Sequence, residues 1–237
     1  MPLTRRHPGI PFILVAVFID MLGMGLVFPV LPVLVGEFAP TPAAQAYWFG
    51  ALDVSYGAMQ FCCSPLLGAL SDRFGRRPIL LTSIVGLGLH YLLIAVAPSL
   101  WVMLIARMIG GLTGASFSVA NAYASDITPP EGRAKAFGQI GAVFGVGFIC
   151  GPMLGGLLGD IDLRLPFYAA ATFSLLNASY GFFLVPESLP HDRRAPFSLA
   201  KANPFAALTK EASLTACISG TAMSRLHVLP SSALQRT

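Results

Sequence analysis

Four ionisable side chains lie inside long apolar stretches of this sequence, where no water stabilises a charge. They are Asp20, Asp53, His90 and Arg107. At 1.5 Å of helix rise per residue, each lies about 11 to 16 Å from one end of its stretch. An apolar membrane core is about 30 Å thick, so all four fall near its middle. Because a charge there costs several kcal/mol unless it is paired, such groups indicate a path for protons, ions or a polar solute.

Asp20 and Arg107 carry opposite charges at similar depths, in the first and fourth apolar stretches. An ion pair between them would relieve the cost of burying either charge alone. Protonation of the carboxylate would then release the guanidinium group, which is the outline of a proton-coupled switch. A static pair with a purely structural role is the alternative interpretation.

Asp53 and His90 form a second candidate site, because histidine changes its charge near neutral pH. Together they could hold a proton or a cation; alternatively, each simply lines a wet cavity. Asp53, Tyr56 and Gln60 are spaced i, i+3 and i+7, so they share one helix face. With Asn121 in the fourth stretch, they are predicted to form a polar stripe on a cavity wall.

Six apolar stretches carry these residues. Hydrophobic residues make up 55 % of the 237 residues and charged residues only 11 %, whereas soluble domains carry about 25 % charged residues. Each stretch reaches or approaches the roughly 20 residues that a membrane-spanning helix needs. We therefore predict an all-α membrane protein with a bundle of six transmembrane helices over 11–185. The stretches are 11–36, 45–70, 79–97, 100–125, 136–159 and 166–185.

The basic residues alternate between the two sides of the predicted bundle. Two precede the first stretch, three lie at 71–78, two at 126–136 and four at 186–210, whereas the opposite loops hold only Arg164. Lys and Arg accumulate on the cytoplasmic side of membranes. We therefore predict that residues 1–10 and the segment 186–210 are cytoplasmic. This distribution explains the isoelectric point near 9.0 without a nucleic-acid partner.

Other chemistry finds little support in the sequence. No Cys or His spacing is typical of a metal or redox site, and no Walker-type Gly-Lys-Ser/Thr run indicates ATP binding. We therefore predict no metal, no cofactor and no enzymatic activity. The predicted partners are the lipid bilayer, protons and a small molecule.

The loop between the second and third stretches reads GALSDRFGRRP from Gly68 to Pro78. Gly75 can adopt a positive φ at low cost, and Pro78 suits the first turn of a helix. Asp72 lies near the carbonyl end of the preceding helix, where an anion is unfavourable. It is therefore expected to have a cationic partner or the N-terminus of another helix nearby. A positive-inside turn with a solvated Asp72 is the alternative.

This loop closely resembles the signature loop of the major facilitator superfamily, a large group of secondary transporters. Further runs resemble the tetracycline/proton antiporters and related drug exporters within that superfamily. These runs lie at 20–32, 106–115, 145–156 and 186–188.

The resemblance implies proton-coupled export of a small drug-like molecule through a multi-pass protein of the bacterial inner membrane. It assigns proton coupling to Asp20 and Arg107. His90 stands where tetracycline exporters carry an acidic residue, and this departure weakens the prediction of tetracycline itself as the substrate. The resemblance assigns gating to the loop residues Gly68, Asp72, Arg73, Gly75, Arg76 and Arg77.

Small residues recur along the fifth stretch. Gly147, Gly151 and Gly155 are spaced by four, so they lie on one helix face, where small residues let two helix backbones approach closely. Packing alone would explain this pattern. The resemblance adds an antiporter-type helix, bent near Pro152 and including Gly156, that helps to seal the extracellular side. The two interpretations are compatible.

The resemblance covers about 11–209 and corresponds to the N-terminal half of a major-facilitator fold. The polar tail at 211–237 contains no seventh apolar stretch and does not resemble the family, as a frameshift or early stop would produce. Self-association or a missing C-terminal half would then be needed to close the cavity. A non-transporting remnant, or an interaction partner of a full-length transporter, is the alternative function. A metabolite or sugar permease is less favoured.

Overall fold

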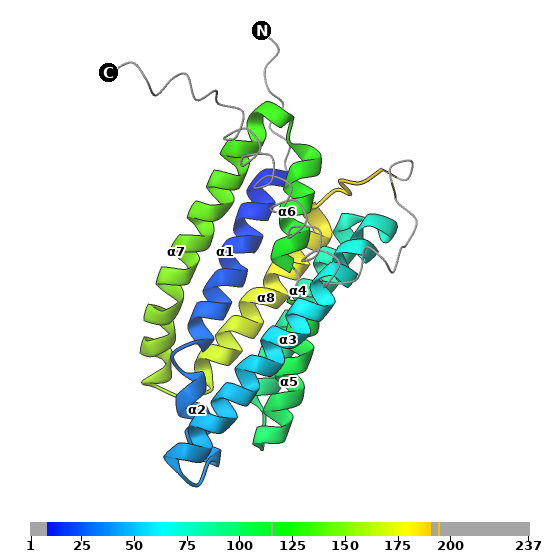
Figure 1. Cartoon of the computed structure of the whole chain (residues 1–237). Helices are drawn as coiled ribbons and strands as arrows, with labels where there is room; N and C mark the ends of the chain where they lie inside the picture. The colour runs from blue at the N-terminus through cyan, green and yellow to red at the C-terminus, as the bar shows by residue number, and fades with distance from the viewer. Residues whose placement is uncertain (1–8, 115, 191–193, 195–237) are drawn as a thin grey trace, which may run out of the picture.

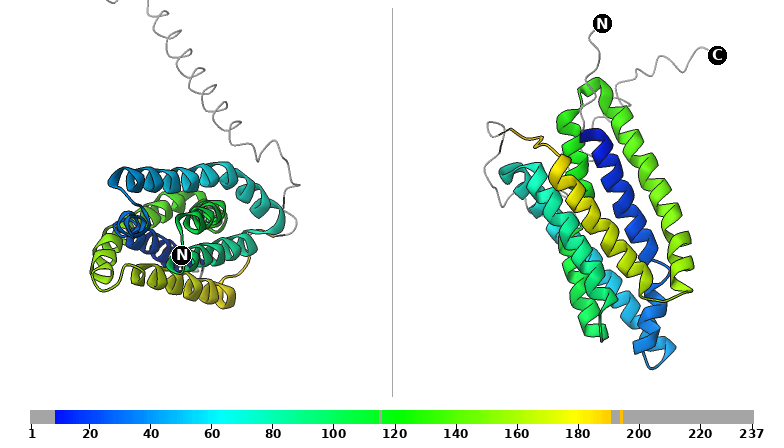
Figure 2. Two further views of the ribbon diagram at one scale, coloured as in Figure 1. Left: turned by 90° about the horizontal axis from the view of Figure 1, so that it is seen from below. Right: turned by 180° about the vertical axis from the view of Figure 1, so that it is seen from behind.

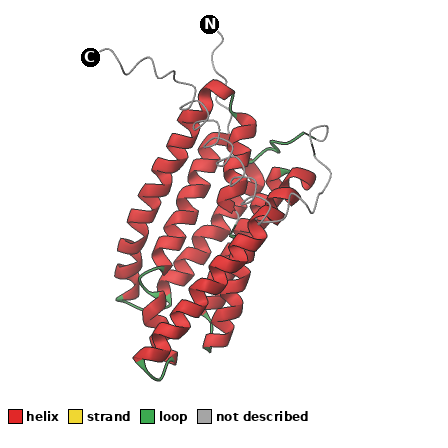
Figure 3. Cartoon of the chain, viewed as in Figure 1, coloured by secondary structure: helices red, strands yellow, loops and turns green. Residues whose placement is uncertain are grey.

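Helices make up the described part of the chain, which confirms the prediction of an all-α membrane protein. The computed structural model describes residues 9–114, 116–190 and 194; this part holds eight α-helices, one short 3₁₀ turn and no strand (Figure 3). The predicted tail at 211–237, residues 1–8 and most of 186–210 lie outside it. The elements are α1 (Gly9–Val27), α2 (Leu31–Phe38), α3 (Pro42–Phe74), α4 (Arg76–Ala95), α5 (Leu100–Thr113), α6 (Ser116–Ile127), the 3₁₀ turn η1 (Pro130–Gly132), α7 (Arg133–Gly159) and α8 (Leu165–Leu184).

The predicted apolar stretches all fall on helices, but two of them are interrupted. In the first, α1 ends at Val27 and α2 begins at Leu31, because Pro29 between them has no N–H to continue the helical hydrogen bonds. In the fourth, α5 gives way to α6 near Gly114. The Gly114 N–H donates to the Gly111 carbonyl oxygen at 3.3 Å, which is a tighter turn than an α-helix makes.

Four helical runs of the described chain are long and apolar enough to cross a membrane. Helices α3 and α8, with 33 and 20 residues, have the required length but are not among these four. The count of six spans therefore stays a prediction. The four runs are Ile10–Val27, Arg76–Ala95, Leu100–Ile127 and Pro130–Gly159.

Helix α1 lies between α7 and α8 (Figures 1 and 2). Helices α1 and α7 meet at glycines, since a Cβ atom on Gly25 would lie only 2.7 Å from the Gly151 Cα atom. On the other side of the bundle, α3 packs against α5, and α4 packs against both α5 and α8. Two apolar clusters fill the space between the helices, one around Leu26 and Leu87 and the other around Phe12.

The connections of the bundle divide between its two ends (Figure 1). One end carries the start of α1, the turn between α3 and α4, the connection between α6 and α7, and the end of α8. We call it the basic end, because Arg76, Arg77, Arg133 and Lys135 lie there. The opposite end carries α2 and the connections that follow α4 and α7.

Candidate functional site

A cavity of about 190 Å³ lies between α1, α3, α4 and α5, in the middle of the bundle. Charged, polar and aromatic side chains face it together, which is unusual at the depth of an apolar core. It contains three of the predicted cavity residues, together with Arg107. Its lining residues are Met24, Val27, Phe28, Asp53, Tyr56, His90, Tyr91 and Arg107.

Arg107 and Asp53 form an ion pair across this cavity. The Arg107 Nη2 atom lies 3.2 Å from the Asp53 Oδ1 atom, and the Arg107 side chain is 11 % exposed against 44 % for Asp53. The guanidinium carbon also lies 5.3 Å from the centre of the Tyr56 ring, which provides a cation–π contact. Helices α3 and α5 can approach this closely because Gly111 has no side chain to meet the Tyr56 backbone.

His90 is bound to the backbone of the neighbouring helix. Its Nδ1 atom lies 2.7 Å from the Ala106 carbonyl oxygen; since a carbonyl only accepts, Nδ1 carries the proton. The ring is almost fully buried, with the Tyr91 ring centre 5.0 Å away and the Tyr56 ring centre 6.0 Å away. The predicted Asp53–His90 site is thus brought to one cavity, but each residue bonds to a different partner.

Asp20 lies in α1, 4 % exposed, one turn before the cavity residue Met24. A Cβ atom on Gly23 would lie 3.3 Å from the Tyr91 ring, so this side of α1 faces the same tyrosine. In the structure, Arg107 forms its ion pair with Asp53. The direct Asp20–Arg107 pair therefore stays a prediction.

Gln60 and Asn121 do not line the cavity. Gln60 donates from Nε2 to the Gly114 carbonyl oxygen at 3.0 Å, which ties α3 to the end of α5. Asn121 donates from Nδ2 to the Phe117 carbonyl oxygen of its own helix at 2.9 Å. Of the predicted polar stripe, Asp53 and Tyr56 reach the cavity and Gln60 continues along α3 toward the basic end.

The turn between α3 and α4 holds a charge network around Arg76. The Arg76 guanidinium contacts Asp72 at 2.6 Å, Asp126 of α6 at 3.1 Å and the Ser71 hydroxyl at 2.6 Å. Asp72 thus has the cationic partner that its unfavourable place at the end of α3 demands. Asp126 was not among the predicted residues, because its place near the end of the fourth stretch gave no distinctive pattern.

Glu187 caps the N-terminus of α4 from the far side of the turn. Its Oε1 atom accepts from the Arg76 N–H at 2.8 Å and from the Leu189 N–H at 3.1 Å, so a negative charge meets the positive end of the helix. Gly75 makes this approach possible, since its φ is +109° and a Cβ atom there would overlap the Glu187 carboxylate. Glu187 was within the Pro186–Ser188 run, yet its role was not predicted.

The remaining loop residues lie at the edge of this network. Arg77 donates to the Phe182 carbonyl oxygen of α8 at 2.5 Å, and its guanidinium carbon lies 5.8 Å from the Phe182 ring centre. Arg73 is exposed and lies over the Phe74 ring at 5.1 Å. A Cβ atom on Gly68 would meet nothing within 4 Å. Arg77 therefore joins the turn to α8, whereas packing gives no reason for a glycine at 68.

The glycine face of α7 packs directly on α1. A Cβ atom on Gly147 would lie 2.9 Å from the Met21 Cβ atom, and the one on Gly151 would lie 2.5 Å from the Gly25 Cα atom. Gly155 meets the backbone of Leu26 in the same way. A Cβ atom on Gly156 would meet nothing within 4 Å, so this residue lies off the face. The Pro152 ring also lies against Gly25, next to the close contact between Gly151 and Gly25.

Comparison with known proteins identifies the family. The Major Facilitator Superfamily matches residues 13–230. The chain is 46 % identical over 200 residues to the class C tetracycline resistance protein of Escherichia coli, covering 84 % of this chain and 50 % of that protein. It is 47 % identical over 171 residues to the class H protein of Pasteurella multocida, covering 72 % and 42 %. The chain thus spans about half the length of these relatives.

Solved structures agree with this assignment. The human organic anion transporter MFSD10 superposes with a TM-score of 0.72 at 27 % identity, covering 82 % of this chain and 51 % of that one. A peptide transporter in complex with sulfate superposes with a TM-score of 0.67 at 15 % identity, covering 94 % and 46 %, and shares the fold alone. From the helical bundle, its loop network and these matches, we conclude that the chain is an integral membrane protein belonging to the major facilitator superfamily.

Proposed function

We propose that this chain serves the proton-coupled export of a small drug-like molecule across the bacterial inner membrane, as a carrier and not as an enzyme. The observation that supports this most directly is the Asp53–Arg107 pair in a cavity at mid-bundle. It occurs on a chain 46 % identical over 200 residues to a tetracycline resistance protein. Secondary transporters place their substrate and coupling-ion sites at this depth.

The proposed orientation puts the basic end in the cytoplasm. Arg76, Arg77, Arg133 and Lys135 lie at this end, and positive residues favour the cytoplasmic side. Arg164, at the opposite end, has its Nη1 atom 2.9 Å from the Ala95 carbonyl oxygen. Its charge therefore meets the negative end of α4, which favours this partly buried arginine on the extracellular side despite the general rule.

Proton coupling in this proposal runs through the carboxylate that holds Arg107. Protonation of Asp53 removes the negative charge at 3.2 Å and weakens the ion pair. The buried guanidinium then needs another anion, either Asp20 on the neighbouring α1 or an anionic group of the substrate. Tyr56, which lies against the guanidinium carbon, holds it near the cavity during the exchange.

The substrate site needs walls beyond this bundle. The cavity of about 190 Å³ is smaller than the roughly 300–1,000 Å³ of typical small-molecule sites. Its aromatic lining of Phe28, Tyr56 and Tyr91 suits a flat, partly apolar molecule with polar edges. We infer that a second helical bundle completes the site, either another copy of this chain or a half of the kind that the longer relatives carry.

The loop network is proposed to act as a gate on the cytoplasmic side. Arg76 joins α3 and α4 to Asp126 of α6, and Glu187 joins α4 to the end of α8. These contacts fix four helix ends in one arrangement. Breaking them would let the ends separate, as the alternating access of a carrier requires.

Inverted membrane vesicles from cells that express the full chain test the transport function. With an imposed proton gradient, vesicles with the unchanged chain should accumulate labelled tetracycline, and collapsing the gradient should release it. Asp53→Asn and Asp20→Asn should each lower this uptake at least tenfold while membrane insertion stays intact. Asp160→Asn is the matched control, because Asp160 is exposed at the end of α7.

Two results would contradict the proposal. Gradient-independent retention of tetracycline would indicate partition into lipid instead of transport. No uptake of tetracycline or of a cationic dye by any variant would favour the alternative that the chain is a non-transporting partner of another membrane protein.

A further inference from the structure

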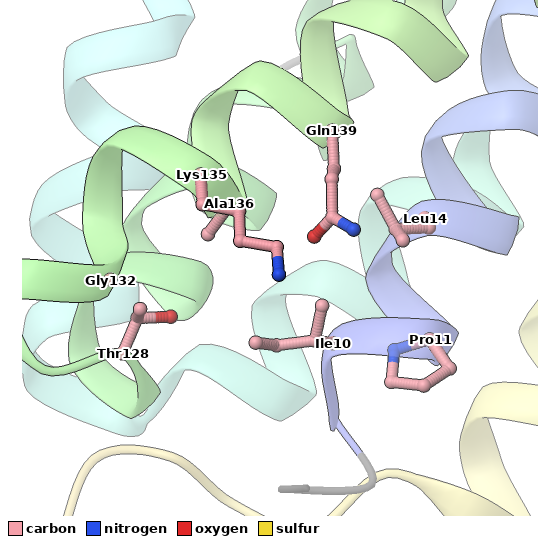
Figure 4. A pocket seen from close by; sticks show the side chains of 8 residues that line it. All are labelled: Ile10, Pro11, Leu14, Thr128, Gly132, Lys135, Ala136 and Gln139. Atoms are coloured by element: carbon pink, nitrogen blue, oxygen red, sulfur yellow. The ribbon is translucent and has the colours of Figure 1, made fainter.

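A pocket of about 470 Å³ opens at the basic end, between the first turn of α7, the end of the α6 segment and the start of α1 (Figure 4). It shares no residue with the mid-bundle cavity. One wall is apolar and consists of Ile10, Pro11 and Leu14 of α1. The other wall carries polar groups, so the pocket is amphipathic.

Three polar side chains turn toward the same space in this pocket. Figure 4 shows the Lys135 amine, the Gln139 amide and the Thr128 hydroxyl directed at its interior. Thr128 is 8 % exposed, and its buried Oγ1 atom has no hydrogen-bond partner among the described residues. A buried hydroxyl without a partner is costly, so a ligand that reached it would be stabilised.

The charge of this pocket is positive. Lys135 has no ion pair within the described part of the chain, and Glu131, the nearest acid in sequence, does not line the pocket. Lys135 and Ala136 also lie in the first turn of α7, although the preceding 3₁₀ turn already bonds the Gly132 N–H to the Pro129 carbonyl oxygen at 2.9 Å and the Arg133 N–H to the Pro130 carbonyl oxygen. The Lys135 ammonium and the positive end of the helix dipole favour an anion.

A second groove continues from this pocket along the same two helices. It is open to the outside, has a volume of about 350 Å³ and shares Leu14 with the pocket. Its other walls are entirely apolar: Val15, Phe18, Ala142, Val143 and Val146. From Lys135 to Val146 the groove follows α7 for eleven residues, or about 16 Å, which is half of an apolar core about 30 Å thick.

We propose that pocket and groove together bind one anionic phospholipid. The phosphate lies against Lys135, Thr128 and the start of α7, and one acyl chain fills the groove between α1 and α7. The length of the groove favours a lipid over a small anion, because a free phosphate would occupy only the pocket and would leave the groove, which is as long as one leaflet is thick, unfilled. The positive charge decides between an anionic and a zwitterionic lipid.

Native mass spectrometry of the full chain in neutral detergent tests this site. The probes are dioleoyl phosphatidylglycerol and dioleoyl phosphatidylcholine, which share their acyl chains, together with glycerol phosphate as a headgroup without chains. The unchanged chain should retain one phosphatidylglycerol at concentrations where phosphatidylcholine is lost. Glycerol phosphate at the same concentration should not displace it.

Variants separate headgroup from acyl-chain binding. Lys135→Gln should weaken phosphatidylglycerol binding about fivefold, as loss of one basic contact near a membrane surface predicts, and weaken phosphatidylcholine binding less, because the choline group offsets the phosphate charge. Arg73→Gln removes one positive charge from an exposed residue that does not line the pocket or the groove, and should change binding less than twofold. Ala142→Trp should fill the groove and weaken the binding of both lipids. Circular dichroism checks that each variant keeps the helical content of the unchanged chain.

Three outcomes would overturn the proposal. Equal effects of Lys135→Gln and Arg73→Gln would show only a general attraction between charges. Displacement by equimolar glycerol phosphate would mean a small-anion site. Equal retention of the two lipids would show that the positive pocket does not select an anionic headgroup. None of these outcomes depends on transport, so the lipid site and the proposed function can fail separately.

Discussion

Replacing Gly151 by alanine should separate α1 from α7. The new Cβ atom would lie 2.5 Å from the Gly25 Cα atom and 2.9 Å from the Leu22 carbonyl oxygen. Ordinary contact begins near 3.4 Å, so the two backbones must move apart by about 1 Å. Neither neighbour is the end of a flexible side chain, and such overpacking costs about 1–3 kcal/mol. We therefore expect a lower free energy of unfolding, despite the better helix propensity of alanine.

Thermal unfolding of the purified chain in detergent, followed by circular dichroism, measures this effect. For a chain of this size, about 1 kcal/mol corresponds to about 2–4 °C in the unfolding midpoint. Gly156→Ala is the control on the same helix, because a Cβ atom there meets nothing within 4 Å. It should leave the midpoint unchanged or raise it. If the two variants behaved alike, the close approach of α1 and α7 at Gly151 would be refuted.

Three further predictions concern the charged contacts. Glu187→Ala removes the cap of α4 and should lower the free energy of unfolding by about 1 kcal/mol, measured as above, whereas Glu131→Ala should change it little. Asp53→Asn leaves Arg107 with a neutral acceptor and should cost about 1–2 kcal/mol; a double-mutant cycle with Arg107→Gln should give a coupling of at least 0.5 kcal/mol, and additive effects would exclude the pair. Arg76→Lys cannot hold two carboxylates and a hydroxyl at once, so the α3–α4 turn should become sensitive to protease where the unchanged chain resists it.

Much of the fold follows from the apolar stretches and from the positions of prolines and glycines. The spacing by four of Gly147, Gly151 and Gly155 predicted one packed face, and the structure places α1 against it. The break at Pro29 could also be predicted from the sequence, since a proline interrupts helical hydrogen bonds. The turn at Gly114 was not, because it depends on α3 packing beside it.

The candidate site was only partly predictable. Depth along each helix placed Asp53, His90 and Arg107 at one level, and the structure brings them to one cavity. Depth says nothing about rotation around the helix axis, so it could not decide which acid faces Arg107. The hydrogen bond of His90 was not predictable either. Its partner is the backbone oxygen of Ala106, and every residue has such an oxygen, so the sequence does not mark it.

The unequal exposure of the two acids bears on how a proton could drive exchange. The Asp53 side chain is 44 % exposed, whereas Asp20 is 4 % exposed. Asp53 is thus open on the side of the cavity that the proposed second bundle would cover, whereas the carboxylate of Asp20 is reached only when the helices around it move. If the chain works as the proposed proton-coupled carrier, protonation of Asp53 loosens Arg107 first, and a change at Asp20 requires the bundle to open. Such an order would link proton uptake to conformational change, because the first step depends on the exposure of Asp53 and the second on the packing of the helices around Asp20.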